Sequence, residues 1–132
     1  MSHWRNYDSN ALKNVKESTL EQTLNTMGYG LNSEVKSVSN VYGSSTCDAA
    51  LTKNKKVVSI GFQYHSNGNG TNSLKVVGDW YGTGINEYTF VDLLSQTYQV
   101  QDIKNKARDN NWNLEGELTN ENGEIELTMY QY

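Results

Sequence analysis

The segment "HSNGNGTN" (His65–Asn72) constrains the fold most, because it joins two strand-like runs with residues that tolerate positive φ angles. The run before it is Val57–Tyr64, and the run after it is Ser73–Trp80. A connection this rich in Asn and Gly brings such runs together as a hairpin. The chain is therefore expected to contain an antiparallel sheet.

Two amphipathic segments flank the strand-like region. The first, "STLEQTLNTMG", predicts a helix over Ser18–Met27, with Ser18 and Glu21 at the spacing of a capping box and Gly28 as the stop. The second predicts a helix over Thr89–Asn110.

The start of the second helix is inferred from Thr89 and Asp92, which also have capping-box spacing. Its apolar stripe consists of Phe90, Leu93, Leu94, Tyr98, Ile103 and Ala107.

The last segment predicts a hairpin that turns at Asn122-Gly123, a favoured pair for a two-residue type I′ turn. That turn places Leu118 opposite Leu127. In this register only Glu121 and Glu124 among the hairpin's glutamates face each other. We therefore interpret the acidic hairpin as a solvated face and not as an acid–base pair.

Further strand-like stretches lie in residues 2–16, Leu31–Val41 and Thr46–Thr52. The expected order is β-α-β-β-β-β-α-β-β. We therefore predict a single α+β domain over residues 1–132, with two helical regions packed on a mainly antiparallel sheet.

Net charge limits the classes of partner. The chain of 132 residues carries a formal charge of −4, which disfavours nucleic acid and anionic membranes as partners. No apolar run reaches a membrane-spanning length and no signal peptide is recognised, so a cytoplasmic protein is expected. Its 17 Asn, its absence of Pro and its excess of Lys over Arg suggest an AT-rich genome of a bacterium or a phage.

Metal and cofactor sites are not expected. Cys47 is the chain's one cysteine, so an intramolecular disulfide is excluded. His3, His65 and Cys47 are too far apart in sequence for the paired spacings of structural zinc. No nucleophile–base arrangement is recognisable, which argues against an enzyme.

Several short motifs, in their order and spacing, resemble the hypothetical chloroplast reading frame 35 family (domain of unknown function 1257). They are "MSHW", "MGYGL", "SIGF", "FVDLLSQTYQV" and "NNWNLEGELTNENGEIELTMYQY". The resemblance covers the whole chain and implies a fold consistent with the one above. It implies no site residues, because the family is uncharacterised. The segment Arg5–Lys16 is longer than is usual in the family.

The opening "MSHW" favours an anchoring role over a metal site. After removal of the methionine, His3 would be second in the chain, whereas an amino-terminal copper or nickel site needs a histidine in third place. Burial of Trp4 would tie the terminus to the core.

The segment "VVGDWYGTGINEYTF" (Val76–Phe90) is the candidate binding site. It combines aromatic residues, glycines and the start of a helix, which together would suit stacking on a planar group and binding of its anionic end. The alternative is a plain connection in which Trp80 folds into the core. The candidate ligand-binding residues are Asp79, Trp80, Tyr81, Gly82, Gly84, Tyr88 and Thr89.

Three hypotheses for the function follow. The first is a non-catalytic binding protein that holds a small anionic or nucleotide-type ligand or blocks a host protein. The second is an accessory subunit that docks on a larger enzyme or ATPase, and self-association into a homo-oligomer stays open under both. The third is an enzyme with an unrecognised carboxylate site. An aromatic pocket near Trp80 would favour a ligand, and a broad apolar patch would favour a partner protein.

Overall fold

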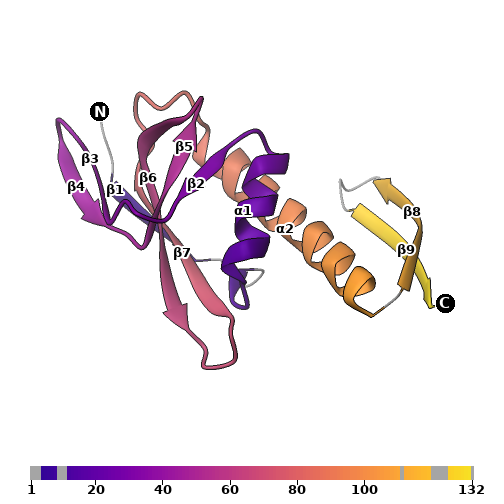
Figure 1. The fold of residues 1–132 in the computed structure, drawn as a ribbon. Helices are drawn as coiled ribbons and strands as arrows, with labels where there is room; N and C mark the ends of the chain where they lie inside the picture. Colours follow the sequence, from indigo (N-terminus) through magenta and orange to yellow (C-terminus); the bar gives the residue numbers. More distant parts are fainter. Residues whose placement is uncertain (1–3, 9–11, 111, 120–124, 132) are drawn as a thin grey trace.

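The computed structural model describes the backbone of residues 4–8, 12–110, 112–119 and 125–131, and the side chains of residues 12–110. The chain folds as an α+β protein with a mainly antiparallel sheet, as the sequence predicts (Figure 1). Its elements are β1 (Trp4–Asp8), α1 (Glu17–Thr26), β2 (Gly30–Asn32), β3 (Ser37–Asn40), β4 (Gly43–Thr46), β5 (Ala49–Lys53), β6 (Lys56–Ser66), β7 (Asn72–Asp79), α2 (Glu87–Asp109), β8 (Trp112–Thr119) and β9 (Ile125–Gln131).

The main sheet has five strands in the order β1-β7-β6-β5-β2, and its neighbouring strands pair antiparallel. Its centre is the long β6–β7 hairpin, which is paired from Ile60 opposite Gly78 to Ser66 opposite Asn72. The hairpin predicted from "HSNGNGTN" is thus confirmed. Gly68 and Gly70 both adopt φ of +81° in the connection, a conformation that glycine adopts easily.

The first predicted helix is α1, which lies within one residue of the expected bounds. Its predicted capping box is wrong, because the helix begins earlier and Lys16 is its N-cap residue, with no side-chain cap bond. The Lys16 N–H instead donates to the Tyr98 hydroxyl at 2.8 Å, so α2 supplies the cap. Gly28 does stop the helix, with φ of +89°.

Two of the predicted strands are each divided in two. The stretch Leu31–Val41 forms β2 and β3, and the stretch Thr46–Thr52 lies across β4 and β5. Asn32 ends β2, because its side-chain Oδ1 accepts the backbone N–H of Glu34 at 3.0 Å and so forms a local turn. β3 and β4 then make a separate two-stranded hairpin.

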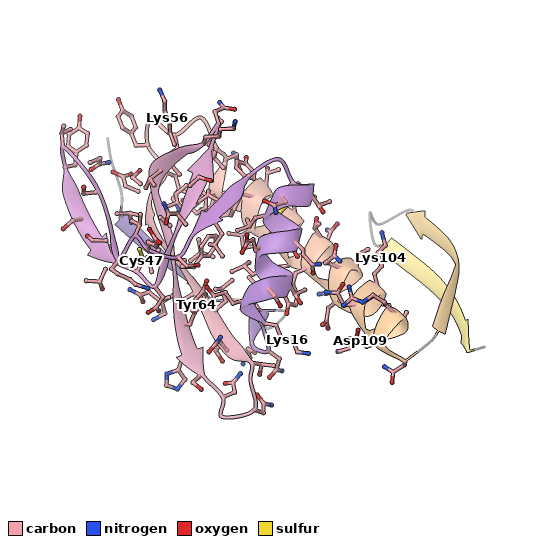
Figure 2. All side chains as sticks on the ribbon, in the orientation of Figure 1. Lys16, Cys47, Lys56, Tyr64, Lys104 and Asp109 are labelled. Carbon is pink, nitrogen blue, oxygen red and sulfur yellow. The ribbon has the colours of Figure 1, made fainter. Side chains whose placement is uncertain are left out.

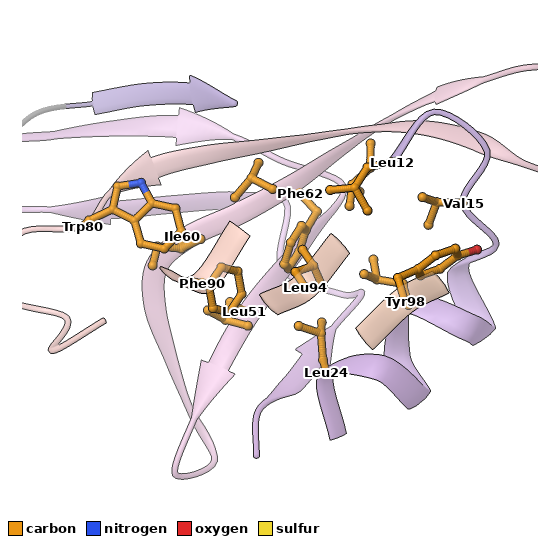
Figure 3. Close-up of a cluster of buried hydrophobic side chains, with 13 residues drawn as sticks. Leu12, Val15, Leu24, Leu51, Ile60, Phe62, Trp80, Phe90, Leu94 and Tyr98 are labelled. Carbon is orange, nitrogen blue, oxygen red and sulfur yellow. The ribbon is translucent and has the colours of Figure 1, made fainter. Parts of the chain in front are cut away.

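The two faces of the main sheet are covered differently. In Figure 1 the helices lie on one side of the sheet and the β3–β4 hairpin lies on the other. The helix side holds the larger core, part of which is shown in Figure 3, with Phe62, Leu94 and Leu24 among its fully buried side chains. The hairpin side holds a small cluster of Val38, Cys47, Ala50 and Val77.

The C-terminal hairpin of β8 and β9 packs on α2 and lies at the end of that helix, away from the main sheet (Figure 1). The predicted register is wrong: Leu118 pairs with Glu126 and not with Leu127. Farther from the turn the register shifts again, at an irregularity between Leu114 and Gly116 where β8 holds one more residue than β9, and an alternating pattern does not reveal such a bulge.

The predicted turn at Asn122-Gly123 lies outside the described residues, as do Glu121 and Glu124. Among the pairs that are described, Glu117 stands opposite Leu127 and Glu126 opposite Leu118, so those pairs set no glutamate against another.

Candidate functional site

The loop singled out from the sequence leaves β7 at Asp79, which is fully buried. Its Oδ2 accepts a hydrogen bond from the Asn40 amide at 2.9 Å, and its Oδ1 accepts the Tyr81 backbone N–H at 3.1 Å. Its backbone carbonyl accepts the Ser59 hydroxyl at 2.5 Å. Asp79 therefore ties the β3–β4 hairpin to the end of the main sheet, and these bonds account for its position without a ligand.

Trp80 belongs to the core. Its side chain is 8% exposed, and its ring lies 5.5 Å from that of Phe90 on α2 (Figure 3). Phe90 in turn makes an edge contact with Tyr29 at 5.3 Å. The structure thus gives Trp80 the alternative role that the sequence left open, and its indole does not present a face for stacking on a ligand.

Tyr81, the next residue, is 55% exposed and meets a residue that the sequence did not single out. Its ring makes an edge contact with Tyr42, at a centroid distance of 6.1 Å and an interplanar angle of 78°. Tyr42 is 61% exposed and follows Val41, which is 92% exposed, between β3 and β4. We call Val41, Tyr42 and Tyr81 the aromatic tip.

The signal for Tyr42 was present in the sequence as "NVYG". Asn40 accepts the Tyr42 backbone N–H through its own side chain at 2.9 Å, which forms a turn of the kind that Asn favours. A turn that carries Val and Tyr exposes them, but nothing local predicts that the turn lies beside Tyr81.

The remainder of the loop is held by its own hydrogen bonds. The Thr83 hydroxyl donates to the Trp80 carbonyl at 2.7 Å and accepts the Ile85 N–H at 3.1 Å. Gly82 and Gly84 adopt φ of +77° and +73°, which explains the glycines without a bound ligand. Lys53 adds a bond from its ammonium group to the Thr83 carbonyl at 3.2 Å. The loop is therefore braced from within and from β5.

The start of α2 differs from the prediction. The helix begins at Glu87, and Asn86 is its N-cap residue, so the proposed start at Thr89 is wrong. The Thr89 N–H donates to Asn86 Oδ1 at 3.0 Å and is not available to an anion. Glu87 places a carboxylate in the first turn, which further disfavours an anion there.

A small hollow lies beside this helix start. It has a volume of about 160 Å³ and contains two of the candidate residues, Gly84 and Thr89. Most of its wall is apolar and comes from the end of α1, the loop and α2, and Leu93 on its rim is 46% exposed. Its lining residues are Met27, Tyr29, Gly84, Ile85, Asn86, Thr89, Phe90 and Leu93.

The seven candidate residues are thus divided by the fold. Asp79 and Trp80 are buried, Tyr81 joins the aromatic tip, and Gly84 and Thr89 line the hollow. Gly82 and Tyr88 are exposed, and neither lines the hollow.

The turn between β5 and β6 lies at the same end of the sheet. Lys53 pairs with Lys56, and the two residues between them, Asn54 and Lys55, have φ of +54° and +66°. These angles fit a type I′ turn, in which glycine is more usual than lysine at the second position. Figure 2 shows Lys56 at this upper end, away from Tyr64 and Lys16.

The Cys47 thiol is not activated as a nucleophile. Burial, followed by the nearby charge of Asp48, raises the pKa of the Cys47 thiol, so it stays protonated at neutral pH. Within residues 12–110, no group of three His, Cys, Asp or Glu side chains could hold a metal ion. No helix in the described part of the chain is long and apolar enough to cross a membrane.

The start of "MSHW" is described only in part. His3 lies outside the described residues, and Trp4 is described by its backbone, which pairs with Asp79 at the edge of the sheet. The anchoring role of the Trp4 side chain stays a prediction.

Comparison with known proteins places the chain in a family without assigning an activity. Neither the curated proteins nor the solved structures contain a match. A family model does match, over residues 23–128, which include the whole of the loop and of the hollow. Because this match covers most of the chain, the protein belongs to the family described as "Protein of unknown function (DUF1257)".

Proposed function

We propose that the protein is a non-catalytic binding protein that docks on another protein through the aromatic tip and the adjacent hollow. The contact between Tyr42 and Tyr81 carries the proposal, because two large aromatic side chains from distant segments meet in solvent and not in the core. Tyrosine is enriched among the residues that dominate protein–protein binding energy.

The hollow supports the same proposal by its size and lining. Its volume of about 160 Å³ is below the roughly 300–1,000 Å³ that is usual for small-molecule sites. An apolar hollow of this size suits one inserted aliphatic or aromatic side chain. Leu93 on the rim would lose water on docking, and Asn86 and Thr89 supply polar atoms at the border.

The internal bracing of the loop would favour docking as well. A surface that is already held in its bound shape loses less conformational entropy on binding. The bonds of Thr83 and Lys53 fix the loop between the aromatic tip and the hollow.

The hypothesis of a small anionic or nucleotide-type ligand has less support. Trp80 is held against Phe90 in the core, and the Thr89 N–H is bonded to Asn86. Two of the features that motivated a stacking and anion site are thus engaged within the protein.

Site-specific photocrosslinking tests the proposal. Benzoylphenylalanine replaces Tyr81 in the full chain, expressed in the cells that carry its gene, and cross-linked proteins are identified by mass spectrometry. The matched control places the same group at Gln96, an exposed position on α2. We expect one protein to be cross-linked from position 81 and not from position 96, with the yield reduced at least fivefold by Tyr42→Ala.

Two outcomes would contradict the proposal. If position 81 gives no protein adduct, or the same adducts as position 96, the aromatic tip is not a docking surface. Native mass spectrometry of the unmodified protein completes the test, since a bound small molecule in place of a protein would favour the ligand hypothesis.

A further inference from the structure

The β5–β6 turn adds positive charge beside the aromatic tip. Lys55 and Lys56 are exposed, and neither ammonium group has an ion-pair partner among the residues whose side chains are described. The bond from Lys53 to Thr83 ties this turn to the loop that carries Tyr81. The two lysines therefore lie at the same end of the molecule as the aromatic tip.

Lysines are concentrated in this turn. The formal net charge is −4, whereas the four positions from 53 to 56 hold three lysines. Asp79, the carboxylate nearest in sequence to the aromatic tip, is fully buried and hydrogen-bonded to Asn40, so it does not face solvent at this end.

The backbone of Lys55 gives a second, independent observation. Its φ of +66° lies in the left-handed region, where a residue with a side chain is less stable than glycine. The turn would form more easily with glycine at this position. The lysine therefore adds nothing to the backbone stability of the turn, while it places an exposed charge there.

We infer that the part of the docking surface around the aromatic tip is selective for an acidic segment of the partner protein, with Lys55 and Lys56 pairing with its carboxylates while the aromatic tip makes the apolar contact. This inference rests on the proposed function. It names a protein and not a nucleic acid, because two lysines on a chain of net charge −4 displace few counterions. Charges at the border of an interface steer association and select partners.

Two lysine variants test the inference in the cross-linking experiment at position 81. Lys55→Gly removes one charge, so the cross-linking yield should fall. It also places glycine, which adopts positive φ easily, in the left-handed conformation, so the melting temperature should stay constant or rise. Lys56→Glu reverses the second charge. The expected fall is about two- to fivefold for each, the scale of one exposed ion pair. Lys13→Glu, an exposed lysine between β1 and α1, is the matched control and should leave the yield unchanged.

Two further readouts separate charge from shape. The yield should fall when the salt concentration rises from 50 to 500 mM, because exposed ion pairs are screened. The partner peptides that are cross-linked should contain an excess of Asp and Glu.

The failures of the two proposals are distinguishable. An adduct that depends on Tyr42 but not on Lys55, Lys56 or salt, or that maps to a basic segment, overturns the acidic partner and leaves docking intact. An adduct with nucleic acid, or none at all, overturns both.

Discussion

The two faces of the main sheet are closed in different ways. The helix side is filled by large side chains such as Phe62, Phe90 and Leu94. The hairpin side is filled by small side chains. There the backbone of β6 lies so close to its neighbour that a Cβ atom added to Gly61 would lie 2.7 Å from Cys47 Cβ. On this side, the hydrogen bond from Asn40 to Asp79 adds a polar connection.

The difference teaches that the same sheet is stabilised by volume on one face and by close approach and hydrogen bonding on the other. Burial of large apolar groups contributes in proportion to area and does not depend on direction. A hydrogen bond to a buried carboxylate depends on one geometry. The aromatic tip is located by the second kind of contact, since Asn40 fixes the hairpin that carries Tyr42.

The largest expected effect concerns the helix face. Phe62→Ala should lower the free energy of unfolding by about 3–5 kcal/mol, because Phe62 is fully buried at the centre of the large core. Val38→Ala on the hairpin face removes less apolar volume and should cost about 2 kcal/mol. Urea denaturation measures both. Equal losses would show that the two faces do not differ in the way described.

A smaller effect is expected for the polar connection of the hairpin face. Asn40→Ala removes a donor to the buried Asp79 carboxylate and should cost about 1–3 kcal/mol. Hydrogen exchange should accelerate in β3 and β4 more than in β6 and β7, because the hairpin loses its tie to the sheet. Protection that stays unchanged in β3 and β4 would contradict this.

The smallest effects concern two tyrosines on the helix face. The Tyr98 hydroxyl accepts the Lys16 N–H, so Tyr98→Phe should cost about 1 kcal/mol. The buried Tyr64 hydroxyl has no hydrogen-bond partner among the described residues, so Tyr64→Phe should leave stability unchanged or raise it. Thermal unfolding of the two variants at neutral pH compares them directly.

The same tyrosines predict the response to alkaline pH. Burial raises the pKa of Tyr64, with a further contribution from Glu17, and burial also raises the pKa of Tyr98. Because the unfolded chain loses these protons first, stability is full below about pH 10 and falls as the pH rises above it. Tyr64→Phe should flatten the fall, and an identical pH profile in that variant would exclude Tyr64 as its source.

The elements that depend on local sequence were predictable. The β6–β7 connection and the Gly28 stop follow from residues that adopt positive φ easily. The two helices follow from apolar spacing, which is a property of neighbouring residues. The start of α1 was not predictable, because Tyr98 caps it from another helix. The start of α2 was missed although it has a local signal, since Asn86 is a favoured N-cap residue.

The exposure of the candidate loop was predictable only in part. The loop after Asp79 does reach an exposed surface, yet Trp80 is buried because α2 brings Phe90 against it. Tyr42 and the lysine turn could not be found from the loop's own residues. They come to it through the fold of β3–β4 and of β5–β6, which depends on pairing between distant segments.

The strand order has a consequence for the time course of synthesis. β1 occupies an edge of the sheet and pairs with β7, so its partner is made only after α1 and five further strands. Until β7 has been synthesised, the backbone N–H and C=O groups of β1 remain exposed to water or to other chains. Pairings between such distant segments form slowly, because a long loop must close first. The earliest strand to leave the ribosome among those described should therefore be among the last to join the sheet.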